Sequence, residues 1–149
     1  MPDLWRLYRA AHGPGLDGIG GTFADGRWHS RGALAVYFGA SAAIVVLERL
    51  AHIDPDLLPD DLQLGLFHLP EGTAPQAAAP PLPDDWTHEE HRSRALGDEW
   101  LRASSSCLLA VPSAILPEET NYLFNPRHPD AASLRLLRER PFSFDVRLI

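Results

Sequence analysis

Glu48 has the surroundings in this sequence that point most clearly to chemistry. It is the only acidic residue from Ala33 to Ile53. In a helix its neighbours three and four places away would be apolar, apart from His52 one turn later. A buried carboxylate is costly unless it is paired, so a carboxylate on an apolar face calls for a reason. The spacing leaves two hypotheses open: a catalytic carboxylate, or an ion pair with Arg49 or another arginine.

Two further candidates precede Glu48 along the chain. Arg27 ends a glycine-rich segment, which would let the backbone approach a ligand closely, and a guanidinium can bind phosphate in a bidentate manner. Tyr37 lies in a short apolar run that is typical of a strand, where a tyrosine is more often a core residue. Taken singly, both residues also have structural interpretations. Because a loop, a strand and a helix follow one another here, Arg27, Tyr37 and Glu48 could converge on one cleft.

Other patterns are weaker. Ser113 follows a buried strand and could donate a hydrogen bond, but the chain has no Gly-x-Ser-x-Gly motif, which argues against Ser113 as a nucleophile. His88 and His91 are three residues apart and lack evident further ligands, so we interpret them as a solvated helix start. The single cysteine, Cys107, lies in an apolar run and is expected to be a buried strand residue. We therefore expect no metal site.

Length, charge and composition limit the classes of function and of binding partner that this chain can have. The 149 residues suit one domain, 1–149. The net charge of -7 argues against direct binding to nucleic acid or to an anionic membrane, since both need a basic surface. All 13 basic residues are arginine, which excludes lysine Schiff-base chemistry and a P-loop. The chain begins without the apolar core of a signal peptide and has no membrane-spanning stretch, so we expect a cytoplasmic protein.

The elements that must position these residues follow from the pattern of apolar residues, glycines and prolines. Strands are predicted over 4–10, 33–38, 62–69 and 106–111, and helices over 42–52 and 88–102. The first helix should begin at an N-cap, Ser41, end at Asp54-Pro55, and be buried on most sides. Loops are predicted over 11–32, 70–86 and 117–129, the last held by Asn121 and Asn125. Residues 134–137 and 142–148 suggest a closing hairpin, with a helix over 131–139 as the alternative.

Six short motifs occur in order along the chain: 26–30 (GRWHS), 36–41 (VYFGAS), 46–48 (VLE), 111–114 (VPSA), 121–129 (NYLFNPRHP) and 142–148 (FSFDVRL). Together they resemble the RES domain, which is named for Arg, Glu and Ser and is the toxin half of bacterial RES-Xre toxin-antitoxin pairs. The resemblance spans Trp5 to Leu148. One departure is visible, because RES domains commonly have Asn where this chain has His29, a polar residue for a polar residue.

The resemblance implies an α+β fold in a single compact domain, similar to ADP-ribosyltransferase toxins such as diphtheria toxin, with central split β-sheets and a few helices. It implies NAD as the substrate. By position, the family residues fall on Arg27, Tyr37, Glu48 and Ser113. His52 could join the same pocket, and Arg9 of the first strand is a candidate extra cation.

These parts predict cleavage of the bond between nicotinamide and ribose. Glu48 would stabilise the oxocarbenium-like sugar and Arg27 would bind the pyrophosphate. Tyr37 would pack against nicotinamide or ribose, and Ser113 would orient Glu48 or a ribose hydroxyl. His52 would tune Glu48 or assist the acceptor.

We expect transfer of ADP-ribose to a protein acceptor, with NAD hydrolysis as an accompaniment. If water or phosphate attacks instead, the protein is an NAD glycohydrolase or phosphorylase. The rival class is a non-catalytic binding module in which Arg27 and Glu48 form a structural salt bridge. The resemblance also implies an Xre-like antitoxin that covers the NAD cleft and takes over DNA binding.

Overall fold

Seven strands form one mixed sheet in the computed structural model, which describes residues 3–70 and 77–149. Their order across the sheet is β4-β5-β6-β2-β1-β3-β7. Neighbours are antiparallel, except that β4 and β5 are parallel. The strands are β1 (Leu4–Arg9), β2 (Val36–Gly39), β3 (Leu62–His68), β4 (Ala77–Ala78), β5 (Leu108–Pro112), β6 (Thr120–Phe124) and β7 (Arg135–Pro141). The predicted α+β class is confirmed.

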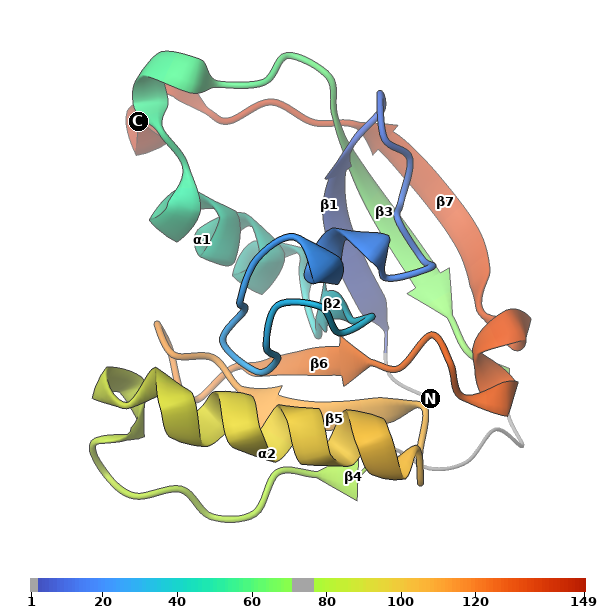
Figure 1. Cartoon of the computed structure of the whole chain (residues 1–149). Coiled ribbons are helices and arrows are strands. Elements are labelled where there is room, and N and C mark those ends of the chain that lie inside the picture. Colours follow the sequence, from blue (N-terminus) through green and yellow to red (C-terminus); the bar gives the residue numbers. More distant parts are fainter. Residues whose placement is uncertain (1–2, 71–76) are drawn as a thin grey trace.

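The sheet is divided at its centre, between β1 and β2. These two strands are joined through a single residue pair among the described residues, Trp5 with Gly39. By contrast, β1 pairs with β3 along its whole length, and β2 pairs with β6 in the same way. Beyond the shared pair the two halves of the sheet diverge, and Figure 1 shows their strands running in different directions. The predicted split of the sheet is therefore confirmed.

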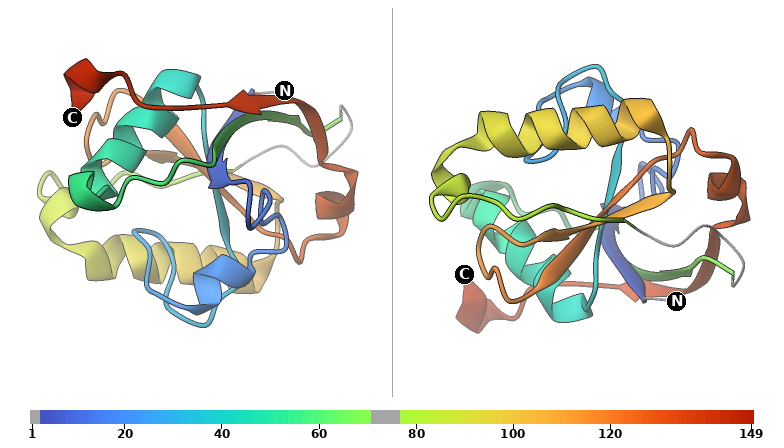
Figure 2. Two further views of the ribbon diagram at one scale, coloured as in Figure 1. Left: turned by 90° about the horizontal axis from the view of Figure 1, so that it is seen from above. Right: turned by 90° about the horizontal axis from the view of Figure 1, so that it is seen from below.

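Two α-helices complete the described fold, α1 (Ala42–His52) and α2 (Glu90–Ala103). The Ser41 Oγ accepts a hydrogen bond from the Ile44 N–H at 3.1 Å, which is the predicted N-cap. α1 starts directly after β2 and packs closely on it, because a Cβ on Gly39 would lie 2.5 Å from the Val45 side chain. In both views of Figure 2, α2 lies apart from α1, across the strands.

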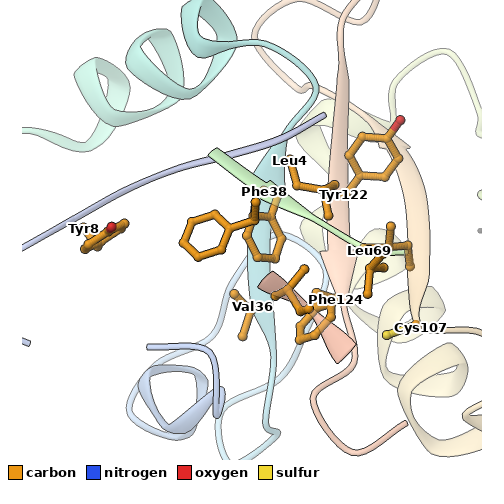
Figure 3. Close-up of a cluster of buried hydrophobic side chains, with 11 residues drawn as sticks. Leu4, Tyr8, Val36, Phe38, Leu69, Cys107, Tyr122 and Phe124 are labelled. Carbon is orange, nitrogen blue, oxygen red and sulfur yellow. The ribbon is translucent and has the colours of Figure 1, made fainter. Parts of the chain in front are cut away.

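The core lies on both faces of the sheet, as the period of two along a strand requires. In β2 the side chains of Val36 and Phe38 join one cluster, which also contains Phe124 (Figure 3). The Phe38 ring meets the Phe67 and Phe124 rings edge-on, with centroids 5.4 and 5.6 Å apart. On the opposite face, Tyr37 packs against the second cluster, which includes Trp28, Trp86 and Trp100. Tyr37 thus points to the side of the sheet that α2 covers.

Four local predictions need correction. Ile44 is the one fully buried residue of α1, so this helix is not buried on most sides. The predicted loop 117–129 contains β6, a central strand whose Tyr122, Leu123 and Phe124 are buried. The loop 70–86 contains the edge strand β4, and residues 71–76 of this loop lie outside the described residues. No closing hairpin forms in the described C-terminal part: β7 is one exposed strand on β3, and the alternative helix is absent there too, with a 3-10 helix at Pro129–Ser133.

Within residues 3–70 and 77–149, no helix has both the length and the apolar character that crossing a membrane would require.

Gly97 of α2 provides a test of how tightly this fold is packed. A Cβ at this position would lie 1.7 Å from the backbone oxygen of Trp28, so Gly97→Ala must displace either α2 or the loop. We expect the free energy of unfolding to fall by about 1–3 kcal/mol, because overpacking outweighs the gain in helix propensity. Urea unfolding measures this. Gly20→Ala is the control, since nothing lies within 4 Å of its added Cβ. Equal stability of the two variants would contradict the close contact.

Candidate active site

The carboxylate of Glu48 is held by two side chains from the other end of the sequence. Its Oε1 accepts a hydrogen bond from the Ser113 Oγ at 2.6 Å and another from the Asn121 Nδ2 at 2.9 Å. Ser113 is fully buried, and its Oγ also accepts from the backbone N–H groups of Ile115 and Leu116. The Oε2 atom of Glu48 makes no hydrogen bond to the described residues. One oxygen is therefore fixed, and the other remains available to a ligand.

The sheet order explains why these residues meet. Asn121 lies in β6 opposite Gly39 of β2, and it is also the partner of Val111 in β5. Ser113 comes directly after β5. Because α1 begins just after β2 ends, its second turn carries Glu48 across to these two strand ends. Asn121 was predicted to hold a loop, so its contact with Glu48 was missed. Had residues 120–124 been recognised as a β-strand, Asn121 would have been expected beside the neighbouring strand ends.

Tyr37 has its hydroxyl group fully occupied within the protein. The hydroxyl accepts a hydrogen bond from the Trp28 N–H at 3.1 Å and lies 2.7 Å from the His29 Nδ1. Burial raises the pKa of Tyr37 well above its usual value, so this phenol stays neutral. What Tyr37 offers the cleft is its ring and not its hydroxyl.

Arg27 lies on the opposite wall of the same cleft. Its guanidinium donates to the backbone oxygen of Thr87 at 3.0 Å, forms an ion pair with Glu90 at 3.4 Å, and lies over the Trp86 ring. Among the described residues Arg27 and Glu48 do not pair with each other, so the salt bridge of the rival binding-module hypothesis is not formed. The Glu90 carboxylate is more than half exposed, and an anionic ligand can replace it as the partner of Arg27.

Helix α2 holds the segment that carries Arg27. The Ser93 Oγ donates to the Arg27 carbonyl oxygen at 2.6 Å, and the Arg94 Nε donates to the Gly26 carbonyl oxygen at 3.3 Å. Asp98 accepts from both the N–H and the hydroxyl of Ser30. The glycine-rich loop is therefore fastened along one helix face and is not a free surface loop.

The cation that the first strand contributes is Arg6 and not Arg9. Arg6 donates to the backbone oxygens of Pro14 and Tyr37 at 2.8 and 2.9 Å and lines the cleft. Burial, reinforced by the charge of Arg49, lowers the pKa of Arg6 to about 10, so it remains charged at neutral pH. Arg9 instead pairs with Asp61 at 2.8 Å and lines a neighbouring depression. Arg6 was missed because alternation along a strand does not reveal which face is inside.

These residues surround one cleft of about 770 Å³, a volume typical of sites for small molecules and cofactors. The cleft opens at the split of the sheet, since both β1 and β2 line it near the pair of Trp5 and Gly39. Glu48 and the exposed His52 line it from α1, and Arg27 lines it from the loop. The arrangement combines one oriented carboxylate, the aromatic ring of Tyr37 and three arginines, Arg6, Arg27 and Arg49. It suits a ligand that has anionic groups and a centre where positive charge develops.

Comparison with known proteins shows the family of this chain. A family model described as the RES domain matches residues 3–145. The chain belongs to the RES domain family. A relative from Pseudomonas putida, named Toxin Res, is 43% identical over an alignment of 147 positions, which covers 97% of this chain and 98% of that protein. A relative from Sphingobium sp. strain YBL2, named Prs ADP-ribosylating toxin, is 34% identical over an alignment of 154 positions, which covers 98% of this chain and 96% of that protein.

The RES fold is also seen in a solved structure. A chain of the crystal structure of the M. tuberculosis MbcT-MbcA toxin-antitoxin complex matches with a TM-score of 0.75 and 16% sequence identity. The match covers 95% of this chain and 84% of that chain. This similarity shows that the two chains share a fold.

In this RES domain the predicted residues are placed as follows. Arg27, Tyr37, Glu48 and His52 line one cleft, and Ser113 lies behind Glu48. Arg9 lies outside the cleft. Arg6, Asn121 and His29 were not predicted, yet they line the cleft or hold residues that line it.

The occupied hydroxyl of Tyr37 leads to a prediction about alkaline stability. Because burial raises the pKa of Tyr37 in the folded state, the unfolded chain loses this proton first, from about pH 10 upward. The contribution of Tyr37 to the free energy of unfolding is therefore fully present below that pH. Above it, the free energy of unfolding falls by about 1.4 kcal/mol per pH unit for each such tyrosine. In Tyr37→Phe this slope should be shallower by about that amount, as urea unfolding between about pH 9 and 12 would measure. Equal slopes in the two proteins would show that Tyr37 ionises in the folded state.

Proposed function

We propose that this RES domain is the toxin of a toxin-antitoxin pair, and that it cleaves the bond between nicotinamide and ribose in NAD. It then transfers ADP-ribose to a protein acceptor, with NAD hydrolysis as an accompaniment. The observation that carries the proposal is the carboxylate of Glu48, which has one oxygen fixed by Ser113 and Asn121 and lies across a cleft from Arg27. The relative from Sphingobium is named an ADP-ribosylating toxin, which supports the same reaction class.

The chemistry needs one well-placed carboxylate. When the bond from the ribose C1′ to the nicotinamide nitrogen breaks, its electron pair moves to the nitrogen and nicotinamide leaves uncharged. The ribose becomes oxocarbenium-like, as in other glycosidic cleavages. The free Oε2 of Glu48 would accept a hydrogen bond from a ribose hydroxyl and stabilise this positive charge. Because Ser113 and Asn121 already hold Oε1, little reorganisation is needed in the transition state.

The remaining residues bind and orient the substrate. Arg27 would exchange Glu90 for the pyrophosphate, and Arg6 would add a buried positive charge. The ring of Tyr37 would pack against nicotinamide or ribose. His52, one turn after Glu48, would tune that carboxylate or assist the acceptor, whose nucleophile attacks C1′ and releases a proton. The proposal requires no metal ion.

The acceptor distinguishes the alternatives within this class. Attack by water would make the protein an NAD glycohydrolase, and attack by phosphate would make it an NAD phosphorylase. Incubation with NAD labelled in its ADP-ribose part, together with a bacterial lysate, separates these outcomes. We expect label on a protein band. Label recovered as free ADP-ribose alone, or as ADP-ribose 1″-phosphate alone, would exclude the protein transfer and retain the bond cleavage.

The proposed partner is an Xre-like antitoxin that covers the cleft. The solved structure with the same fold comes from a toxin-antitoxin complex, which supports a partner of this kind. Such a pair would act in the cytoplasm, where NAD is available to it.

The first functional prediction concerns Glu48. Glu48→Gln keeps the size of the side chain and an oxygen that can accept from Ser113 and Asn121, but it removes the negative charge. We expect nicotinamide release to fall by about 100- to 1000-fold, with little change in thermal stability. Glu99→Gln, at an exposed position of α2, is the matched control and should retain wild-type activity. Wild-type nicotinamide release by Glu48→Gln would refute the mechanism.

The second functional prediction concerns Arg27. Loss of its guanidinium removes charge-assisted hydrogen bonds to the pyrophosphate, so Arg27→Ala should raise the KM for NAD by about 10- to 100-fold. The effect on kcat should be much smaller, because these contacts exist in both the ground and transition states. Initial rates over a range of NAD concentrations measure both constants. Arg31→Ala changes an exposed arginine of the same loop and serves as the control. An unchanged KM for Arg27→Ala would exclude its role in binding NAD.

A further inference from the structure

His29 is a buried histidine, 5% exposed, whose two ring nitrogens both have partners. The Nε2 atom lies 3.1 Å from the backbone oxygen of Gly21 and 3.1 Å from that of Ala24. Carbonyl oxygens accept hydrogen bonds and cannot donate them, so Nε2 must carry the hydrogen. In the neutral ring Nδ1 is then an acceptor, and the hydroxyl of Tyr37 donates to it at 2.7 Å.

This tautomer sets the direction of a chain of hydrogen bonds. The Trp28 N–H donates to the Tyr37 oxygen, the Tyr37 hydroxyl donates to His29, and His29 donates to the glycine-rich loop. The chain joins the peptide that follows Arg27 to the ring that faces the cleft. It also anchors both to the loop segment around Gly21. A phenylalanine at position 29 could fill a similar volume, but the Tyr37 hydroxyl and the carbonyl oxygens of Gly21 and Ala24 would lose their hydrogen bonds to the ring.

His29 itself does not line the cleft within the described residues, so it has no direct contact with a ligand there. Its influence on the cleft runs through Tyr37. The hydroxyl accepts from the Trp28 N–H and donates to His29, so these two hydrogen bonds hold the Tyr37 ring against the start of the Trp28 peptide. Such fixed orientation matters in catalysis, because small displacements of a substrate-positioning group are costly to the rate.

We propose that His29 is a positioning residue for Tyr37, and that the acceptor at Nδ1 sets the orientation of the Tyr37 ring in the NAD cleft. This inference rests on the proposed function for its effect on rate. Its geometric part concerns the folded protein alone. His29 makes two separable sets of hydrogen bonds: Nδ1 accepts from Tyr37 and orients it, and Nε2–H donates to the carbonyl oxygens of Gly21 and Ala24 in the loop.

Two substitutions separate these two sets of hydrogen bonds. In His29→Asn the amide oxygen can occupy the position of Nδ1 and accept from Tyr37, but the side chain is too short to reach Gly21 and Ala24. In His29→Gln the amide can reach the position of Nε2 and donate to those carbonyl oxygens, but no acceptor remains beside Tyr37. A merely structural role would change stability and activity together. The proposed role predicts that the variant with the higher thermal stability has the lower activity.

The experiment measures kcat, KM and thermal unfolding for both variants. We expect His29→Gln to have kcat/KM about tenfold lower than His29→Asn, although His29→Asn has the lower Tm. In the Tyr37→Phe background, which lacks the hydroxyl, this difference in kcat/KM should disappear. Equal kcat/KM for the two variants, or a difference that persists in the Tyr37→Phe background, would overturn the proposal.

A second readout does not depend on activity. NMR of the protein with ¹³C-labelled tyrosine rings reports whether the Tyr37 ring has one environment or several. We expect a single ordered environment in the wild type and in His29→Asn, and averaging in His29→Gln. If the wild type releases no nicotinamide, the proposed function fails, but these spectra still test the positioning by His29. An ordered wild-type ring that is equally ordered in His29→Gln would refute it.

Discussion

The structure depends on one constraint: β1 and β2 share a single residue pair and then separate. Residues of both strands line the cleft, which opens where this pairing stops. The separation opens a cleft whose walls are still rigid, because each half of the sheet is fully paired on its other side. Gly39 allows this arrangement, since α1 packs directly on it at the point of separation. Thus the same residue joins the halves, ends β2 and admits the helix that carries Glu48.

The carboxylate of Glu48 is stabilised in the cleft wall by hydrogen bonds from residues that are distant in the sequence. Ser113 and Asn121 lie 65 and 73 residues away along the chain, yet both reach the same carboxylate oxygen. They come from the ends of adjacent strands, so the sheet order alone brings them together. Both hydrogen bonds to Oε1 come from neutral donors, and within the described residues no cation forms an ion pair with this carboxylate. That is what a residue needs if it is to stabilise positive charge on a substrate.

The opposite wall is organised by a helix and not by the sheet. α2 binds the segment 26–30 through Ser93, Arg94 and Asp98, and Gly97 allows Trp28 to approach closely. A loop with many glycines would otherwise lose much conformational entropy on binding a ligand. In this fold the segment loses its conformational entropy when the protein folds, because α2 already holds it. The backbone at Arg27 is therefore in position before any ligand binds. Both the arginine and the carboxylate are thus preorganised, each by a different part of the fold.

The sequence by itself determined the local elements with strong end signals, and it selected four residues that the structure brings together at one cleft. The bounds of α1 follow from Ser41 and from the proline after Asp54, and the motifs that resemble the RES domain selected Arg27, Tyr37, Glu48 and Ser113. Only the tertiary structure decided which arginine of β1 faces the cleft, because alternation gives two faces and strand pairing chooses between them. It also decided that Asn121 lies in a central strand and binds Glu48, and that β7 continues where a turn was predicted. Those outcomes depend on pairing with distant strands, which outweighs the turn preference of nearby prolines and polar residues.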